Sequence, residues 1–118
     1  LCHAADEAAT LDDLTALMTE DVTWAMTSGV LEGRPGVAAG LQGARDRGLT
    51  GPGSQTRHLL TTVSVAVDGD GATASSRSGW LLVRGGEQPA LLMVGEYVDA
   101  WVVRGGTALL RARRVVRG

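Results

Sequence analysis

The chain has 118 residues, a length that suits one domain with a single core. Eleven basic and thirteen acidic side chains leave a net charge of −2, which gives no electrostatic basis for binding nucleic acid or an anionic membrane. The apolar runs are far shorter than the ~18 residues that span a bilayer, and the single Cys2 excludes an intramolecular disulfide.

Residue usage adds three expectations. Every basic residue is Arg, and Lys, Phe, Ile and Asn are absent, which indicates a bacterial genome of high GC content. The first residues lack the basic and apolar regions of a secretory signal, so we expect a cytoplasmic protein. One Cys and two His residues give no zinc-ligand spacing, so we expect neither a metal nor a cofactor.

The N-terminal third mixes helix and strand signals. Alanines at 4–9 predict the end of a helix that begins before the first residue. A capping-box pattern at 10–13, followed by apolar residues at helical spacing, predicts a helix over 11–18. Alternation over 21–26, turn residues and a short apolar segment at 30–32 predict a hairpin.

The middle of the chain predicts one helix and one loop. A proline near the start and an apolar stripe predict a helix over 36–46. Glycine, proline and serine over 47–54 predict a loop, either a plain connector or a flap over a cavity.

Four long strands are predicted in the second half, at 57–67, 72–84, 90–103 and 108–117. Short glycine-containing joints separate them, and such joints are typical of hairpins. The sequence therefore predicts a single α+β domain over 1–118 with a mixed or antiparallel sheet.

The strongest candidate for acid-base chemistry is His58, near the start of the first long strand. An imidazole can both donate and accept a proton near neutral pH; the alternative is a strand-end histidine that is hydrogen-bonded to the backbone. On the third long strand, Tyr97 and Asp99 share one face with Met93 and Trp101, because side chains alternate across a strand.

Asp99 has two interpretations. It is either the orienting or second acid-base group beside His58, or one half of a salt bridge to an arginine of the last strand, of which the candidates are Arg111, Arg113 and Arg114. Tyr97 is a candidate hydrogen-bond donor to a developing oxyanion.

Other side chains are candidates for lining a hydrophobic cavity. Trp24, Met26, Trp80 and Met93 lie in predicted strands, where ordinary core packing is the alternative. Glu7 lies where its carboxylate is directed either at the sheet or at solvent. No Gly-x-Ser-x-Gly elbow, phosphate loop or dinucleotide fingerprint is present, so neither a covalent mechanism nor nucleotide binding is expected.

The order of several segments resembles the SnoaL-like branch of the nuclear transport factor 2 superfamily. The segments are Asp-Val-Thr-Trp at 21–24, Gly-Arg-Pro at 33–35, Arg-His-Leu-Leu-Thr-Thr-Val at 57–63, Gly-Glu-Tyr-Val-Asp at 95–99 and Arg-Arg-Val-Val at 113–116. The resemblance covers nearly the whole chain. It implies an α+β cone, in which helices fold over a strongly curved sheet and enclose a ligand pocket.

The resemblance also suggests roles for single residues. His58 matches the pocket histidine of scytalone dehydratase, Glu7 falls near its first-helix aspartate, and Asp99 near its late-strand asparagine. Met26 stands where that dehydratase has a tyrosine and ketosteroid isomerase has its aspartate base. The acid and arginine set of limonene epoxide hydrolase has no clear match here.

Two functions therefore stay open. The first is a cofactor-independent acid-base enzyme (dehydratase, isomerase or cyclase) acting on a hydrophobic cyclic or polyketide-like molecule, with His58, Asp99 and Tyr97 as catalytic groups. The second is a noncatalytic ligand-binding or subunit-association module similar to the small subunit of ring-hydroxylating dioxygenases. The resemblance also implies a homodimer formed through the outer face of the sheet.

Overall fold

The computed structural model describes residues 1–117, apart from the side chain of His3. Its helices are α1 (Cys2–Glu7), α2 (Asp12–Thr15) and α3 (Gly33–Asp46). Its strands are β1 (Met18–Met26), β2 (Gly29–Glu32), β3 (Thr56–Val67), β4 (Thr73–Arg84), β5 (Ala90–Arg104) and β6 (Thr107–Arg117). They form one sheet in the order β2-β1-β6-β5-β4-β3.

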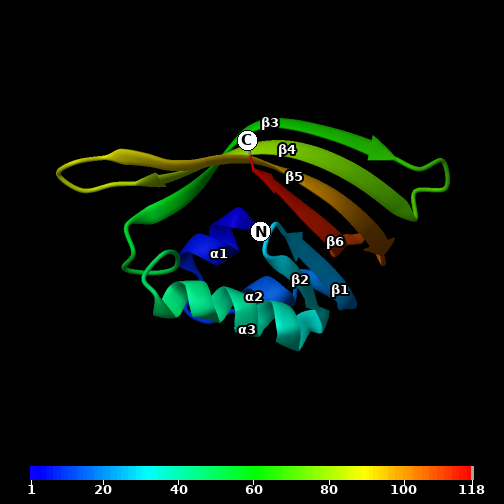
Figure 1. Ribbon diagram of the computed structural model, residues 1–118. Helices are drawn as coiled ribbons and strands as arrows, with labels where there is room; N and C mark the ends of the chain where they lie inside the picture. Colours follow the sequence, from blue (N-terminus) through cyan, green and yellow to red (C-terminus); the bar gives the residue numbers. More distant parts are fainter. Residues whose placement is uncertain (118) are drawn as a thin grey trace.

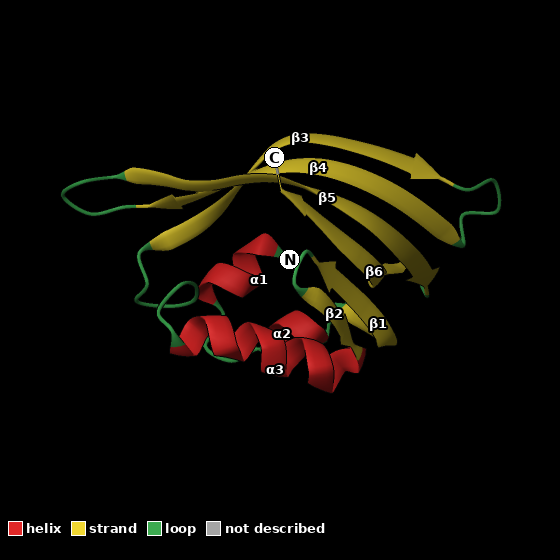
Figure 2. Cartoon of the chain, in the orientation of Figure 1, coloured by secondary structure: helices red, strands yellow, loops and turns green. Residues whose placement is uncertain are grey.

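The sheet is strongly curved and the helices lie on its concave side. Strands β3, β4 and β5 arch over α1, α2 and α3 (Figures 1 and 2). The predicted α+β cone is therefore confirmed. Side chains on the concave face of the sheet point toward the helices, so a site enclosed by the fold must be built from these two layers.

The sheet is mixed, because one of its strand pairs is parallel. The three hairpins that join β3, β4, β5 and β6 are antiparallel, as their glycine joints indicated. Strand β1, however, pairs with β6 in parallel, with Trp24 opposite Arg113. No short loop links the first strand to the last, so turn chemistry carries no information about this pair.

The predicted helix over 11–18 is shorter than expected. Helix α2 ends at Thr15, and β1 already begins at Met18. The backbone N–H of Leu110 donates to the Leu17 carbonyl at 2.9 Å, and Met18 pairs with Leu110. Pairing with the last strand therefore overrides the helical spacing of these residues. The capping-box prediction was also wrong, because α2 has no side-chain cap hydrogen bond.

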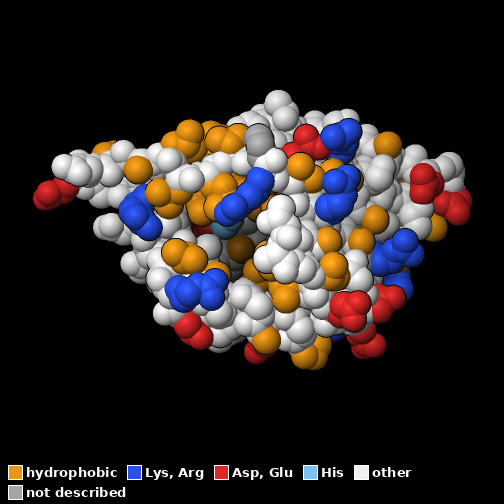
Figure 3. Space-filling view, in the orientation of Figure 1, with side chains coloured by type: hydrophobic (Ala, Val, Ile, Leu, Met, Phe, Trp, Pro, Cys, Tyr) orange, Lys and Arg blue, Asp and Glu red, His pale blue; other side chains and the backbone are white. Residues whose placement is uncertain are grey.

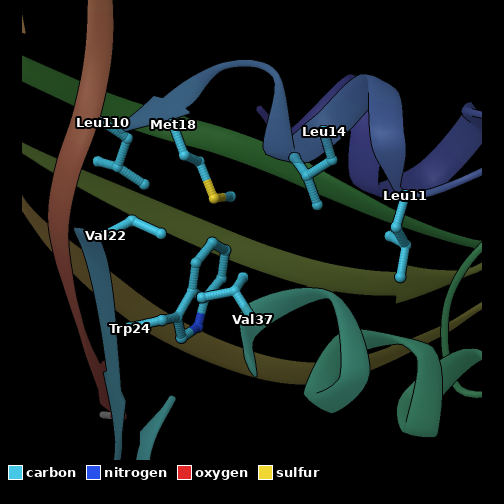
Figure 4. Close-up of a cluster of buried hydrophobic side chains, with 7 residues drawn as sticks. All are labelled: Leu11, Leu14, Met18, Val22, Trp24, Val37 and Leu110. Atoms are coloured by element: carbon cyan, nitrogen blue, oxygen red, sulfur yellow. The ribbon is translucent and has the colours of Figure 1, made fainter. Parts of the chain in front are cut away.

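The main core lies between the helices, β1 and β6 (Figure 4). It consists of Leu11, Leu14, Met18, Val22, Trp24, Val37 and Leu110. Burying each of these side chains stabilises the fold by about 1.5–3 kcal/mol. Helix α3 is also fixed to β1 because Arg34 donates to the Met18 carbonyl, with its Nε at 3.0 Å. This core anchors the helical layer against one half of the sheet.

No helix within residues 1–117 is long and apolar enough to cross a membrane.

The joint between β4 and β5 projects beyond the helical layer at the left of Figure 1.

Candidate active site

A small cavity lies between α1, α3 and the concave face of the sheet; we call it the inner cavity. Its volume is about 80 Å³. Its apolar wall is formed by Leu1, Ala5, Leu11, Trp24, Leu41 and Ala44, and its polar wall by Cys2, Arg45, Thr50, His58, Tyr97 and Arg113. Figure 3 shows a hollow in the surface between the sheet and the helices, with hydrophobic and basic side chains around it.

His58 on β3 is paired with Asp6 on α1. Its Nδ1 lies 2.6 Å from Asp6 Oδ1, and its backbone N–H donates to Asp6 Oδ2 at 2.7 Å. The side chains are 14% and 6% exposed, so water competes little for this pair. Because a carboxylate only accepts, Nδ1 carries the proton, which leaves Nε2 as the nitrogen that can reach a ligand.

Helix α1 has six residues and is held in place by side chains at its C-terminal end. Arg45 of α3 donates through Nη2 to the carbonyl of Ala5 at 3.0 Å. Glu7 pairs with Arg57 at the surface, next to the Asp6 and His58 pair. A helix this short is not stable alone, so these contacts with α3 and β3 fix the position of Asp6.

Behind His58, the rings of Trp80 and Tyr97 are stacked. Their centroids are 5.3 Å apart with an interplanar angle of 20°, and the Trp80 ring lies 6.1 Å from His58. Gly95 makes the stack possible, because a Cβ at this position would lie 2.3 Å from Trp80 Cζ2. Tyr97 thereby reaches the wall of the inner cavity, while Trp80 supports it from behind.

Asp99 on β5 and Arg113 on β6 form a buried ion pair in the middle of the sheet. Arg113 donates through Nε to Asp99 Oδ1 and through Nη2 to Asp99 Oδ2, each at 2.9 Å. The guanidinium also lies between two rings, 3.7 Å from the centroid of Tyr97 and 5.0 Å from that of Trp24. This bidentate and stacked arrangement fixes the plane of the guanidinium.

A second and larger hollow, which we call the outer cleft, continues along the concave face beyond Arg113. Its volume is about 420 Å³. Leu60, Val63, Val65, Val67, Trp101 and Val103 form most of its apolar wall, with Ser76, Ser78, Asp99 and Arg113 as polar groups. Leu1, Cys2 and Arg113 line both hollows, so these three residues form the partition between them.

Burial keeps two groups of the inner cavity in their neutral forms. Burial raises the pKa of the Tyr97 phenol above its ordinary value, with the neighbouring Cys2 acting in the same direction. Burial also raises the pKa of the Cys2 thiol, although Arg113 opposes it. At neutral pH Tyr97 is therefore a hydrogen-bond donor, and Cys2 is a thiol with little nucleophilic character.

The structure brings together some of the predicted site residues and separates others. His58, Tyr97 and Trp24 lie on the inner cavity, and Asp99 lies on the outer cleft. Trp80 and Met93 belong to a neighbouring apolar cluster behind the wall, and Met26 packs on the main core. Glu7 lies outside both hollows, against Arg57. Its side chain is 41% exposed.

The partner of His58 was not predicted. The sequence suggested Asp99 as its orienting group, but both oxygens of Asp99 are bound by Arg113. Asp6 takes that place instead of the neighbouring Glu7. The choice between Asp6 and Glu7 depends on how α1 docks on β3, which the sequence alone does not record.

Arg45 was also missed as a cavity residue. Its position in the second half of α3 gave no sign of a functional role. Among the residues that the structure describes, no group of three or more His, Cys, Asp and Glu side chains is arranged to hold a metal ion.

Comparison with known proteins identifies the family. A family model described as a SnoaL-like domain matches residues 1–114, so the chain belongs to the SnoaL-like domain family. This fold is that of a small-molecule-binding domain that also serves cofactor-independent enzymes. No curated protein matches the chain significantly.

Solved structures share the fold at low sequence identity. A variant of Rv3472 from Mycobacterium tuberculosis, of unknown function, is 26% identical with a TM-score of 0.73; the match covers 88% of this chain but only 57% of that one. Aln2 from a Streptomyces species is 23% identical with a TM-score of 0.81, covering 98% of this chain and 81% of that one.

A third similar structure belongs to a different class of protein. It is the beta subunit of a putative aromatic-ring-hydroxylating dioxygenase from Novosphingobium aromaticivorans, which is 17% identical with a TM-score of 0.69. The match covers 91% of this chain and 75% of that one. The fold is therefore shared with a protein named as a subunit of a larger enzyme, and the site has to decide the function.

Proposed function

We propose that this SnoaL-like protein is a cofactor-independent acid-base enzyme that acts on a hydrophobic cyclic or polyketide-like molecule by dehydration, isomerisation or aldol cyclisation. The observation that carries the proposal is the Asp6 and His58 pair on the wall of a small, largely apolar cavity. A histidine oriented by a buried carboxylate, with one nitrogen left for a ligand, is the arrangement that proton transfer requires.

In this mechanism His58 Nε2 removes a proton next to a carbonyl of the substrate. Asp6 holds the ring through Nδ1 and stabilises the imidazolium that forms. Tyr97, kept neutral by burial, donates a hydrogen bond to the developing enolate oxygen. The imidazolium then returns its proton to a carbon or to a departing hydroxyl, which gives isomerisation or dehydration respectively.

Asp99 has a different role in the proposal from the one expected. With both carboxylate oxygens bound to Arg113, it is not free to take a proton. It holds Arg113 in place between the rings of Tyr97 and Trp24, and we assign it a positioning role.

The test is deuterium exchange into an enolisable cyclic ketone such as tetralone, measured by mass spectrometry in D₂O. We expect His58→Gln to lower the protein-dependent exchange rate by about 10²- to 10⁴-fold, because general acid-base catalysis contributes about that factor. Ser64→Ala on the same strand, where the side chain is exposed, serves as the matched control. Unchanged exchange with His58→Gln would remove the proposal.

The second candidate is a noncatalytic ligand-binding or subunit-association module. The observation that favours it is an apolar row on the outer face of the sheet, where Leu59, Leu81 and Val94 lie opposite one another on β3, β4 and β5. Leu59 and Val94 are exposed. We propose that a second copy of the chain covers this row, which gives a homodimer.

Sedimentation of the wild-type chain and of Val94→Asp tests the dimer. A dimer that dissociates in the variant supports the association surface, and a monomeric wild-type chain rejects it. Because the row lies on the opposite face from His58, the result is independent of the exchange assay.

A further inference from the structure

The partition between the two hollows contains a positively charged side chain, Arg113, which favours a ligand with an acidic group. Arg113 lines both the inner cavity and the outer cleft. We propose that a single amphiphilic ligand occupies both hollows, with an acidic oxygen bound to Arg113 and an apolar body lying along the inner face of β3. This inference rests on the proposed function, because it names the class of substrate that would present its reacting carbon to His58.

The two volumes favour a ligand that extends through the partition. The inner cavity, at about 80 Å³, is well below the roughly 300–1,000 Å³ of ligand pockets, whereas the outer cleft has about 420 Å³. Only Leu1 and Cys2, at the start of the short helix α1, separate them beside Arg113. A molecule that reaches His58 therefore has most of its volume in the outer cleft.

The hydrogen-bonding capacity of Arg113 supports an acidic group at the partition. Its Nε and Nη2 donate to Asp99, while Nη1 has no hydrogen-bond partner among the described residues. Arg113 lines both hollows, so this donor is placed where a ligand would lie. The stacked rings hold the guanidinium in one plane, which directs this remaining donor.

The inner wall carries a second positive charge, that of Arg45. Arg45 donates to backbone carbonyls, and no carboxylate in the described part of the chain pairs with it. No acidic side chain lines the inner cavity: Asp6 lies behind His58 and Asp99 lies on the far side of Arg113. Apart from His58 Nε2, which accepts, the inner wall offers the phenol of Tyr97 and the guanidinium groups of Arg45 and Arg113 as donors, so it is complementary to an anionic or enolate oxygen.

The apolar part of the ligand is indicated by β3. Val63, Val65 and Val67 line the outer cleft and are 60%, 61% and 64% exposed. Large apolar side chains that stand exposed along one concave wall mark a binding surface. The charged group Arg113 lies at the inner end of the cleft. A rigid apolar molecule that carries an acid can enter the cleft and reach Arg113 more readily than the surface of another protein can.

The experiment compares naphthoate with naphthamide, which have the same shape and differ in charge. Binding is measured at neutral pH by calorimetry. We expect naphthoate to bind at least tenfold more tightly, and Val65→Asp to weaken naphthoate binding at least tenfold by placing a carboxylate in the outer cleft. Val30→Asp makes the same change at a valine of β2 that is 57% exposed and lines neither hollow, so it should leave binding unchanged.

Several outcomes would overturn the inference. Equal affinities for the two probes would reject the acidic group, and no naphthoate binding up to about 1 mM would reject this ligand class. A Val65→Asp variant that binds naphthoate normally but changes oligomeric state would assign the cleft to a second copy of the chain. His58→Gln should still bind naphthoate, so loss of exchange in that variant and loss of binding in Val65→Asp are separate failures.

Discussion

Two buried carboxylates, each paired with a basic side chain, occupy different parts of this interior. Asp6 comes from a six-residue helix and meets His58 on an edge strand, whereas Asp99 and Arg113 lie opposite each other on two central strands. The first pair depends on the docking of a helix, and the second is built into the register of the sheet. The distances within the two pairs are similar, at 2.6 Å and 2.9 Å, but the pairs differ in the chemistry that they allow.

The difference lies in what the basic partner can do. A guanidinium stays protonated at any physiological pH, so the Asp99 and Arg113 pair can hold charge but cannot move a proton. An imidazole can give up its proton, so the Asp6 and His58 pair can take part in proton transfer. Burial and short hydrogen bonds alone therefore do not identify a catalytic carboxylate; the partner decides.

The largest expected effect on stability concerns the central pair. Replacing Arg113 by Met leaves Asp99 buried without a counter-charge, and we expect this to lower the free energy of unfolding by about 3–5 kcal/mol. Arg77→Met breaks the pair with Glu96 in the same sheet, where the side chains are 69% and 36% exposed, and should cost at most about 1 kcal/mol. Urea unfolding of both variants measures the difference. Equal losses would mean that the central pair behaves as a surface pair.

A smaller effect is expected when the other carboxylate is altered. Asp6→Asn keeps an oxygen near His58 but removes the charge that stabilises its imidazolium, so we expect the exchange rate to fall by about tenfold to a hundredfold. Asp13→Asn on α2, where the side chain is exposed, is the control. An unchanged rate would separate Asp6 from the chemistry.

The smallest effect concerns Tyr97, which lies against Arg113 and is stacked on the ring next to His58. It is the single tyrosine of the chain, so ultraviolet absorbance follows its ionisation alone. Burial raises its pKa, so we expect phenolate to form in the native protein only well above the ordinary value of about 10. Because the folded state favours the neutral phenol, this contribution to stability is complete below about pH 10 and is lost at higher pH.

The chain unfolded in guanidinium is the reference for that titration. Its tyrosine should titrate near the ordinary value. A native protein that titrates at the same pH would show that the ring is accessible to water.

The sequence was sufficient to predict the elements that depend on neighbouring residues in the chain, such as the four long strands. Glycine joints and alternating residues gave the four long strands to within one or two residues. The salt bridge of Asp99 was one of two interpretations left open, because register between neighbouring strands was needed to choose Arg113. The extent of α2, the parallel β1 and β6 pair and the contact of Asp6 with His58 depend on residues far apart in the chain, which no local pattern records.

The hydrogen bond from the backbone of His58 gives the docking of α1 a spectroscopic readout. Strand β3 is at the edge of the sheet, and the His58 amide donates to the Asp6 side chain. Its protection from hydrogen exchange therefore measures how often α1 leaves the sheet, not how often the strands separate. A single amide signal thus reports the fraction of molecules in which Asp6 and His58 are paired.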